Sequence, residues 1–333
     1  MSKESVNLEK RKEFEKFIVP HKLYAAAMKK VDDCIDASLV SADPSSCLIT
    51  GSAGTGKSTL CKDIVKRVEK KYPPSTAVGD DSIKKIISIF NTSLESGVSI
   101  KGVAKEMIIN LGSRDTKGDQ TDLTLRLYDL LKTCETKLIV LDEFHHLLQR
   151  GAERTKELVS DWVKNLMNKT KIPVIIVGTP ECEDIIDAYP QLSRRYSYRE
   201  ELKPFEYDFD RESDYIKVLK SLNNAFERFG EVTISPKLSD EQMALAIYVA
   251  TGGLMDSIRK LLAQILKTNL HKDINSVSKR DFANAYSALT LEGRIVRLIN
   301  VNPFDLTMAE LAGVINKLSI SKSKKDTKKW ELK

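Results

Sequence analysis

Long apolar runs are missing from this 333-residue sequence, and their absence sets the first limits on its function. No segment approaches the roughly 20 consecutive apolar residues that a helix needs to cross a bilayer. The N-terminal residues MSKESVNLEKRKEFEKF lack the apolar core of a secretory signal peptide. We therefore expect a cytoplasmic protein without a membrane partner.

The sequence also lacks any regular spacing of cysteine or histidine. Its five cysteines include no C-x-x-C pair, and in a reducing compartment we expect them to be free and mostly buried thiols. The four histidines show no metal-ligand spacing. His145 and His146 are adjacent and would point in different directions on a helix, so we interpret them as structural or partner-facing residues.

Charge is concentrated at one end of the chain. The formal net charge is +6, and residues 317–333 hold seven lysines against two acidic residues. The remainder is nearly neutral, so a nucleic-acid site there would be a local stripe and not a globally basic surface. The lysine-rich tail fits a solvated end as well as a contact with a polyanion.

The order of apolar runs predicts an α/β protein with a second, all-helical part. Short β-prone runs alternate with helical segments, which is typical of a parallel sheet with crossover helices. Later segments show helix periodicity alone. We expect a helical extension (1–45), an α/β domain (46–204), a helical lid domain (205–290), and a C-terminal helix with the lysine-rich tail (291–333). The five strands are expected at Cys47–Thr50, Ile86–Phe90, Lys137–Leu141, Pro173–Val177 and Arg195–Leu202.

The segment GSAGTGKST fits the phosphate-binding pattern G-x-x-x-x-G-K-[ST]. A β-prone run precedes it and a helical run follows it, which is the context that this motif needs. Glycines let successive backbone N–H groups point at a polyphosphate, and the start of the helix favours the same anion. Lys57 can reach the β- and γ-phosphates, and Ser58 can hold Mg²⁺. We therefore predict an ATP site at Gly51, Ser52, Ala53, Gly54, Thr55, Gly56, Lys57, Ser58 and Thr59.

Two carboxylates follow the third expected strand. Four apolar residues end in Asp142 and Glu143, 85 and 86 residues after Lys57. At the carboxyl end of the strand Asp142 would lie beside Ser58 and help to hold Mg²⁺. Glu143 would polarise the water that attacks the γ-phosphate.

Polar residues near the fourth and fifth strands complete the predicted site. The fourth strand is expected between the first and third, so that Thr179 would orient water near the γ-phosphate or, alternatively, cap the next helix. Arg194 and Arg195 lie where the fifth expected strand begins. At the domain edge either one could reach a neighbouring subunit's nucleotide as an arginine finger, or form a surface salt bridge.

A glycine pair begins a helix in the predicted lid domain. Arg259 lies two turns into this helix, which contains GGLMDSIRKLL at 252–262. The arginine could fold back onto the phosphates and couple the nucleotide state to the domain angle. It could also be an ordinary exposed arginine.

In this order the elements resemble Walker A, Walker B, sensor 1, arginine finger and sensor 2 of AAA+ ATPases. Within that class, residues 15–290 are similar to the TniB/TnsC family of transposition regulators. Besides the phosphate loop, the resemblance is based on LIVLDEFHHLL at 138–148, VGTP at 177–180, QLSRRY at 191–196 and the helix at 252–262. The length is closer to compact members, including those of CRISPR-associated transposons. Thr179 departs from the asparagine that is common at sensor 1.

The resemblance implies a ring or helical filament that forms on double-stranded DNA when ATP is bound. Such an assembly connects a TniQ-type target selector to a DDE transposase, and hydrolysis resets it. Lys101, Lys105, Arg150 and Arg154 would then contact DNA phosphates from the loops after the second and third strands, although each also fits a solvated surface.

Two other functions use the same phosphate loop. A helicase-loader or initiator-type AAA+ ATPase would prefer single strands and need aromatic residues in the pore, for which Phe144 is the one candidate. A metabolic kinase would leave the helical domain, Glu143 and the two neighbouring arginines without a role.

Overall fold

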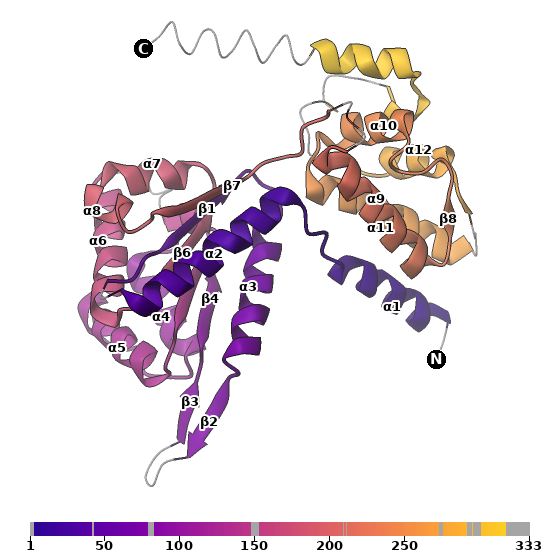
Figure 1. Ribbon diagram of the computed structural model, residues 1–333. Helices are drawn as coiled ribbons and strands as arrows, with labels where there is room; N and C mark the ends of the chain where they lie inside the picture. The colour runs from indigo at the N-terminus through magenta and orange to yellow at the C-terminus, as the bar shows by residue number, and fades with distance from the viewer. Residues whose placement is uncertain are drawn as a thin grey trace, which may run out of the picture. The chain divides into compact units, whose positions relative to one another are not determined.

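The computed structural model divides the chain into two compact units (Figure 1). The α/β unit comprises Leu23–Lys203, and the helical unit comprises Met1–Lys22 with Pro204–Lys333. The segment up to Lys22 therefore groups with the helical unit, whereas a single extension over 1–45 was expected. The structure describes residues 3–41, 43–78, 83–147, 153–208, 210, 212–272, 276–291, 295 and 301–317.

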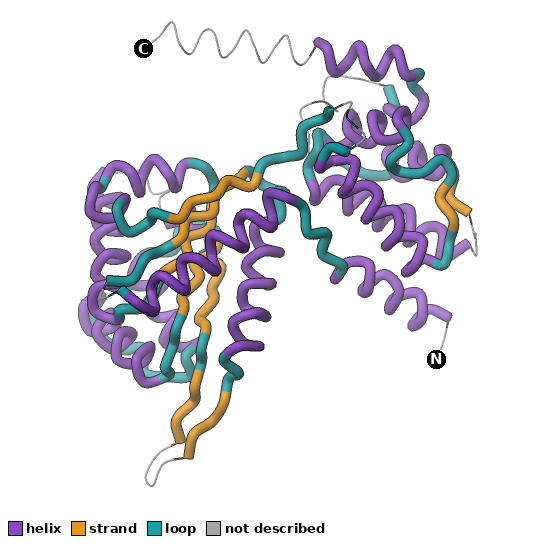
Figure 2. Tube along the Cα trace, viewed as in Figure 1, coloured by secondary structure: helices purple, strands orange, loops and turns teal. Residues whose placement is uncertain are grey.

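A five-stranded parallel sheet, coloured orange in Figure 2, forms the centre of the α/β unit. The order of its strands is β4-β5-β6-β1-β7. Every residue of the three central strands is buried, so these strands are apolar runs without alternation. The predicted parallel sheet is confirmed, as is the position of the fourth predicted strand between the first and the third. The strands are β1 Cys47–Gly51, β4 Ile89–Ser93, β5 Leu138–Asp142, β6 Val174–Gly178 and β7 Tyr198–Leu202.

Helices cover both faces of this sheet. Alternate strand residues such as Leu48, Leu141 and Ile176 belong to one apolar cluster with α4, α5, α6 and α7. Helices α2 and α3 lie on the opposite side (Figure 1). A capping box at Asp119 and Asp122 starts α5. The bounds are α2 Lys22–Val40, α3 Lys57–Lys71, α4 Ile100–Asn110, α5 Gln120–Thr133, η1 Phe144–Leu147, α6 Glu153–Thr170, α7 Glu181–Ala188 and α8 Pro190–Ser193.

An antiparallel hairpin that was not predicted projects from the α/β unit (Figure 1). It pairs β2 (Ser75–Val78) with β3 (Ile83–Ile86). The expected single strand Ile86–Phe90 is instead divided between β3 and β4. The division falls at Ser88, which is buried and donates its hydroxyl to the carbonyl of Tyr72 at 2.7 Å.

The helical unit packs its helices around a separate apolar core. Helix α10 is buried along almost its whole length, which explains its lack of amphipathic pattern. Helix α1 contributes Phe14, whose ring meets Phe226 edge-on with centroids 5.6 Å apart. The two-residue strands β8 Thr233–Ile234 and β9 Ser276–Val277 were too short to predict. The main elements are α1 Lys3–Lys16, α9 Asp214–Gly230, α10 Glu241–Thr251, α11 Met255–Lys272, α12 Lys279–Ser287 and η3 Pro303–Asp305, followed by a helix over 308–317.

Two compositional predictions can be compared with this structure. All five cysteines are free and buried, as expected. None of the helices in the described ranges combines the length and the apolar character that a bilayer crossing requires. The lysine-rich tail lies outside the described residues from position 318 onward.

Candidate nucleotide site

The phosphate-binding loop leaves β1 and turns directly into α3. Gly56 precedes the helix with a φ of 100°, in the left-handed region that glycine adopts without strain. At Gly51 a Cβ atom would lie 2.3 Å from the carbonyl oxygen of Leu202, so the close approach of β7 also requires glycine. No side chain caps the start of α3, which leaves its first backbone N–H groups available for an anion.

Lys57 is held inside this loop. Its side chain is 6% exposed, and its Nζ donates hydrogen bonds to the carbonyls of Gly51 at 2.8 Å and Ser52 at 2.9 Å. The hydroxyl of Thr55 also donates to Ser52, at 2.9 Å. A phosphate oxygen offers Lys57 a stronger, charge-assisted partner than a carbonyl does. The loop therefore fits a polyphosphate, with a lysine already aimed inward.

Asp142 and Glu143 lie at the carboxyl end of β5. Asp142 is 4% exposed and accepts a hydrogen bond at 2.8 Å from the backbone N–H of Glu143. Burial, and then the neighbouring Asp142 carboxylate, raise the pKa of the Cys61 thiol in α3. This thiol is one helical turn beyond Ser58, so α3 and β5 place the two predicted Mg²⁺ ligands at the same edge of the sheet. Oxygen ligands of this kind suit Mg²⁺.

Glu143 adopts a left-handed backbone conformation, with a φ of 54°. Such a φ is uncommon for a residue with a side chain, and strain of this kind concentrates at functional sites. The turn sends the chain into η1, and the Glu143 side chain remains one-third exposed beside His145.

His145 and His146 face each other, with ring centroids 4.2 Å apart. The expectation that they point in different directions is wrong, because they lie in a single 3₁₀ turn and their rings pack together. His145 Nδ1 is 3.3 Å from Glu143 Oε2. Burial lowers the pKa of His145, followed by His146, while Glu143 acts in the opposite direction and Lys57 adds to the lowering. His145 therefore interacts electrostatically with the predicted general base Glu143 and the predicted phosphate ligand Lys57, which the sequence did not indicate.

Thr179 follows β6, which lies between β5, where Asp142 is the last residue, and β1, which leads into the phosphate-binding loop. Its hydroxyl bonds to the carboxylate of Glu181, and this bond is the main cause of a lowered pKa for Glu181. The residue that caps α7 is Pro180, which has no side-chain cap bond. The hydroxyl thus contacts an acidic side chain at the site, and its predicted action on water stays a prediction.

The two neighbouring arginines have different surroundings. Arg195 is mostly buried, with Nη2 bonded to Asn168 Oδ1 and 4.0 Å from Asp43. Arg194 is exposed, and within the described part of the chain its side chain donates one long bond of 3.4 Å, from Nε to the carbonyl of Pro190 in its own turn. Both line a pocket together with Asp43, Lys164, Asn168 and Gln191.

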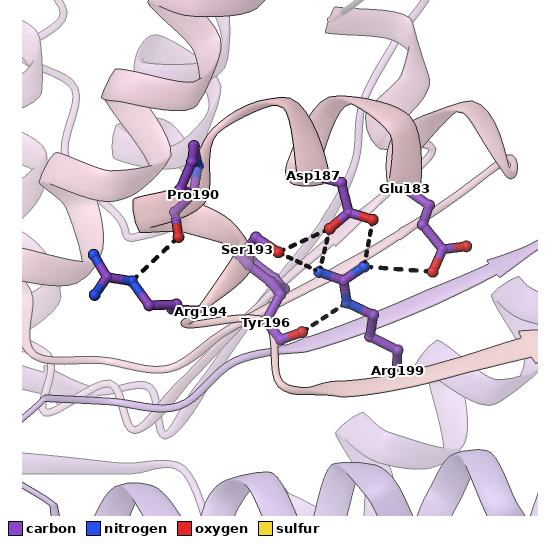
Figure 3. A network of polar contacts seen from close by, with 7 residues as sticks. All are labelled: Glu183, Asp187, Pro190, Ser193, Arg194, Tyr196 and Arg199. Atoms are coloured by element: carbon purple, nitrogen blue, oxygen red, sulfur yellow. Dashed lines mark hydrogen bonds and ion pairs between the residues drawn. The ribbon is translucent and has the colours of Figure 1, made fainter.

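Arg199 fixes the segment that carries Arg194 (Figure 3). Its guanidinium makes two bonds to Asp187, at 2.6 and 2.9 Å, and one to the hydroxyl of Ser193 at 3.0 Å. The Arg199 guanidinium holds the pKa of the Asp187 carboxyl below its usual range. A bidentate pair of this kind is geometrically specific, so it ties α7 to α8. No sequence motif indicated a role for Arg199. The acidic residues of α7 could have suggested that a nearby arginine pairs with this helix.

The predicted DNA contacts are only partly covered by the structure. Lys101 and Lys105 are one turn apart on α4, and both are partly exposed. Arg150 lies outside the described residues, and Arg154 lies in the first turn of α6 with a side chain that is not described. All four contacts remain predictions.

Arg259 binds the end of helix α1. Its guanidinium donates to the carbonyls of Phe14 and Phe17 at 2.7 Å and of Glu15 at 3.1 Å. It also lies 5.4 Å from the centre of the Phe14 ring. A cation here satisfies carbonyls that the end of a helix leaves without intrahelical partners. In this structure Arg259 therefore stabilises the helical unit, and its predicted contact with nucleotide stays a prediction.

Replacing Arg259 by methionine is expected to loosen α1. Loss of hydrogen bonds from a charged donor destabilises by about 1.5–3 kcal/mol, which corresponds to roughly 10–100-fold faster opening. Hydrogen exchange of the α1 amides measures this directly. The control is Lys260→Met, because Lys260 is 60% exposed and forms a surface ion pair with Asp256 that contributes little. Unchanged α1 protection would mean that Phe14 packing alone holds the helix.

Comparisons with known proteins identify the family of this chain and agree with its fold. Residues 13–207, more than half of the chain, match the family described as bacterial TniB protein. No curated protein gives a significant match. The Aeropyrum pernix ORC2 protein has 17% identity and a TM-score of 0.60, covering 84% of this chain and 71% of that one. Cdc6p from Pyrobaculum aerophilum has 13% identity and a TM-score of 0.59, covering 87% of this chain and 74% of that one. The Aeropyrum pernix ORC1 protein in complex with DNA has 14% identity and a TM-score of 0.57, covering 92% of this chain and 85% of that one. At these identities the likeness is one of fold alone, the AAA+ fold.

Proposed function

The chain belongs to the TniB family, and from this premise we propose that it is an ATP-hydrolysing AAA+ regulator of DNA transposition. It assembles as a ring or filament on duplex DNA. The observation that supports the proposal is the order β5-β6-β1 in the sheet, because these three adjacent strands lead directly to Asp142 and Glu143, to Thr179, and to the loop before Lys57. Open parallel sheets bind ligands at this edge.

ATP and Mg²⁺ fit the donors at this edge. The loop Gly51–Thr59 would hold the phosphates through backbone N–H groups and Lys57. Ser58 and Asp142 would hold Mg²⁺, which supplies charge to stabilise the phosphoryl oxygens. Glu143 is one-third exposed and can accept a proton from water. Thr179 would hold that water in line.

The second half of the proposed site comes from a neighbouring copy. Of the two candidate fingers, Arg194 is the better placed, because it is exposed and Arg199 fixes its turn (Figure 3). Arg195 already donates a hydrogen bond to Asn168 and lies 4.0 Å from Asp43 within its own subunit. An arginine supplied in trans makes hydrolysis depend on assembly. Nucleotide state would then control whether the copies stay joined.

DNA and protein partners follow from the family. Lys101 and Lys105 on α4 would contribute to a phosphate-binding stripe, which becomes continuous only when subunits assemble. A TniQ-type target selector and a DDE transposase would bind the assembled form. Contacts with phosphates carry little sequence information, so target choice would rest with the selector.

Electron microscopy and size-exclusion chromatography test the proposal. The wild-type chain is mixed with long duplex DNA, magnesium and a non-hydrolysable ATP analogue, and we expect rings or filaments. Lys57→Ala should remain unassembled under the same conditions, because it loses the phosphate contact. A wild-type chain that stays monomeric at saturating nucleotide and DNA would contradict the proposal.

The loader or initiator alternative is less well supported. It requires an exposed aromatic residue for stacking on single-stranded bases. Phe144, the candidate in the sequence, is 1% exposed and belongs to the apolar core of the α/β unit. Comparing affinity for single-stranded and duplex DNA separates the two functions.

A further inference from the structure

The turn after β5 gathers three metal-ligating side chains that the proposed ATPase mechanism does not need together. Glu143, His145 and His146 each offer one ligand atom, and these atoms lie within 4.8 Å of one another. All three residues are partly exposed. The left-handed φ of Glu143 and the 3₁₀ turn that follows produce this grouping.

The ligand atoms are close to the spacing that a small ion requires. Nitrogen and oxygen ligands at about 2.1 Å from a tetrahedral ion lie roughly 3.4 Å apart. His145 Nδ1 and Glu143 Oε2 already have this spacing, at 3.3 Å. Small side-chain rotations would bring in the second imidazole, whose ring already packs against the first.

One of these ligand atoms lacks a hydrogen-bond partner among the described residues. His145 Nδ1 is buried, and among the described residues it makes no hydrogen bond of acceptable geometry, although the Glu143 carboxylate is close. Buried polar atoms in native proteins are nearly always satisfied. A metal ion held jointly by this nitrogen and the carboxylate would satisfy both groups.

We propose that Glu143, His145 and His146 form a zinc site, separate from the Mg²⁺ position at Ser58 and Asp142. Imidazole nitrogen favours zinc, whereas Mg²⁺ favours oxygen ligands alone. Zinc at this position occupies the Glu143 carboxylate and withholds it from the attacking water, so the ion inhibits hydrolysis. The inhibition rests on the proposed ATPase function; zinc binding by the three side chains does not.

Metal binding is tested first on the full, untagged, metal-free chain without nucleotide. Co²⁺ serves as the visible probe, and Zn²⁺ is then titrated against it. We expect one ion per chain, with a visible absorption stronger than that of hydrated Co²⁺, and displacement by Zn²⁺ but not by excess Mg²⁺. His145→Gln, His146→Gln and Glu143→Gln should each weaken binding by about tenfold or more, since even loss of a supporting contact costs 10–100-fold.

His271→Gln is the matched control, since it removes a histidine elsewhere in the sequence and should bind as the wild type does. Far-ultraviolet circular dichroism and thermal unfolding confirm that each variant is folded. The wild-type Co²⁺ spectrum needs no variant and provides an independent readout. Absence of binding to the wild type below millimolar metal, or equal binding by all the variants, would overturn the zinc site.

Inhibition is measured separately, by comparing each protein with its own zinc-free rate. With Mg²⁺ and ATP in excess, Zn²⁺ should lower the wild-type rate at least tenfold while His146→Gln keeps most of its own rate. If zinc binds as predicted but both proteins lose activity equally, the inhibitory role is wrong while the site stands. If the wild-type chain has no ATPase activity at all, the proposed function fails and the binding result is unaffected.

Discussion

Glu143→Gln is expected to slow ATP hydrolysis by about 10²–10⁴-fold, the usual contribution of a general base. Glutamine has nearly the same size, but it cannot accept the proton of the attacking water. Lys57, Ser58 and Asp142 stay in place, so ATP binding and ATP-dependent assembly should persist. The variant should therefore accumulate stable, nucleotide-bound assemblies on DNA. Steady-state phosphate release and filament lifetime measure the two effects.

The matched control for this substitution is Glu69→Gln, on the exposed face of α3 in the same unit. It removes one carboxylate from the surface and should change neither rate nor lifetime. A Glu143→Gln protein that hydrolyses ATP at the wild-type rate would remove Glu143 from the mechanism. A Glu143→Gln protein that fails to bind ATP would show instead that the residue supports the loop.

Arg194→Ala should lower the ATPase rate of the DNA-bound assembly by about 10³-fold, the lower end of the range for an arginine finger. The exposed side chain makes one weak bond, so thermal stability should hardly change. Arg195→Ala is the contrasting variant. It removes the bond to Asn168 Oδ1, while Asp43 keeps its ion pair with Lys171, and should destabilise the unit by roughly 1–3 kcal/mol. Paired measurements of rate and melting temperature separate the two arginines.

Mixing experiments show whether Arg194 acts on a neighbour's nucleotide. Subunits with Glu143→Gln retain the finger, and subunits with Arg194→Ala retain the base. In a random equal mixture about one interface in four combines an intact site with an intact finger, because the interface is heterologous. Activity should therefore return to about a quarter of the wild-type value. Absence of rescue, with co-assembly confirmed, would exclude a finger in trans.

Local patterns explain why much of this site was predictable. The phosphate loop and the carboxylates after β5 are short segments whose function depends on backbone chemistry within a few residues. Because the strands are parallel and adjacent, the segments that contain Lys57, Asp142 and Thr179 all follow the carboxyl ends of strands, at the same edge of the sheet. A sequence pattern therefore selects the candidate residues, and the order of the strands places the segments that contain them next to one another.

The features that sequence reasoning missed depend on geometry that no local pattern encodes. A left-handed φ at Glu143 turns two histidines toward each other, although adjacent residues on an α-helix would diverge. Arg259 reaches carbonyls more than 240 positions away in the sequence. The interruption at Ser88 follows from a bond to Tyr72, sixteen residues earlier. Each requires the tertiary structure to be known first.

The grouping of α1 with the C-terminal helices determines the order in which the chain can fold during synthesis. Phe14 and the carbonyls at the end of α1 leave the ribosome early, but their partners Phe226 and Arg259 emerge only after the entire α/β unit. Domains generally fold as they emerge. The α/β unit is thus complete before the partners of α1 have been made, which leaves the Phe14 side chain without its apolar contacts for most of translation.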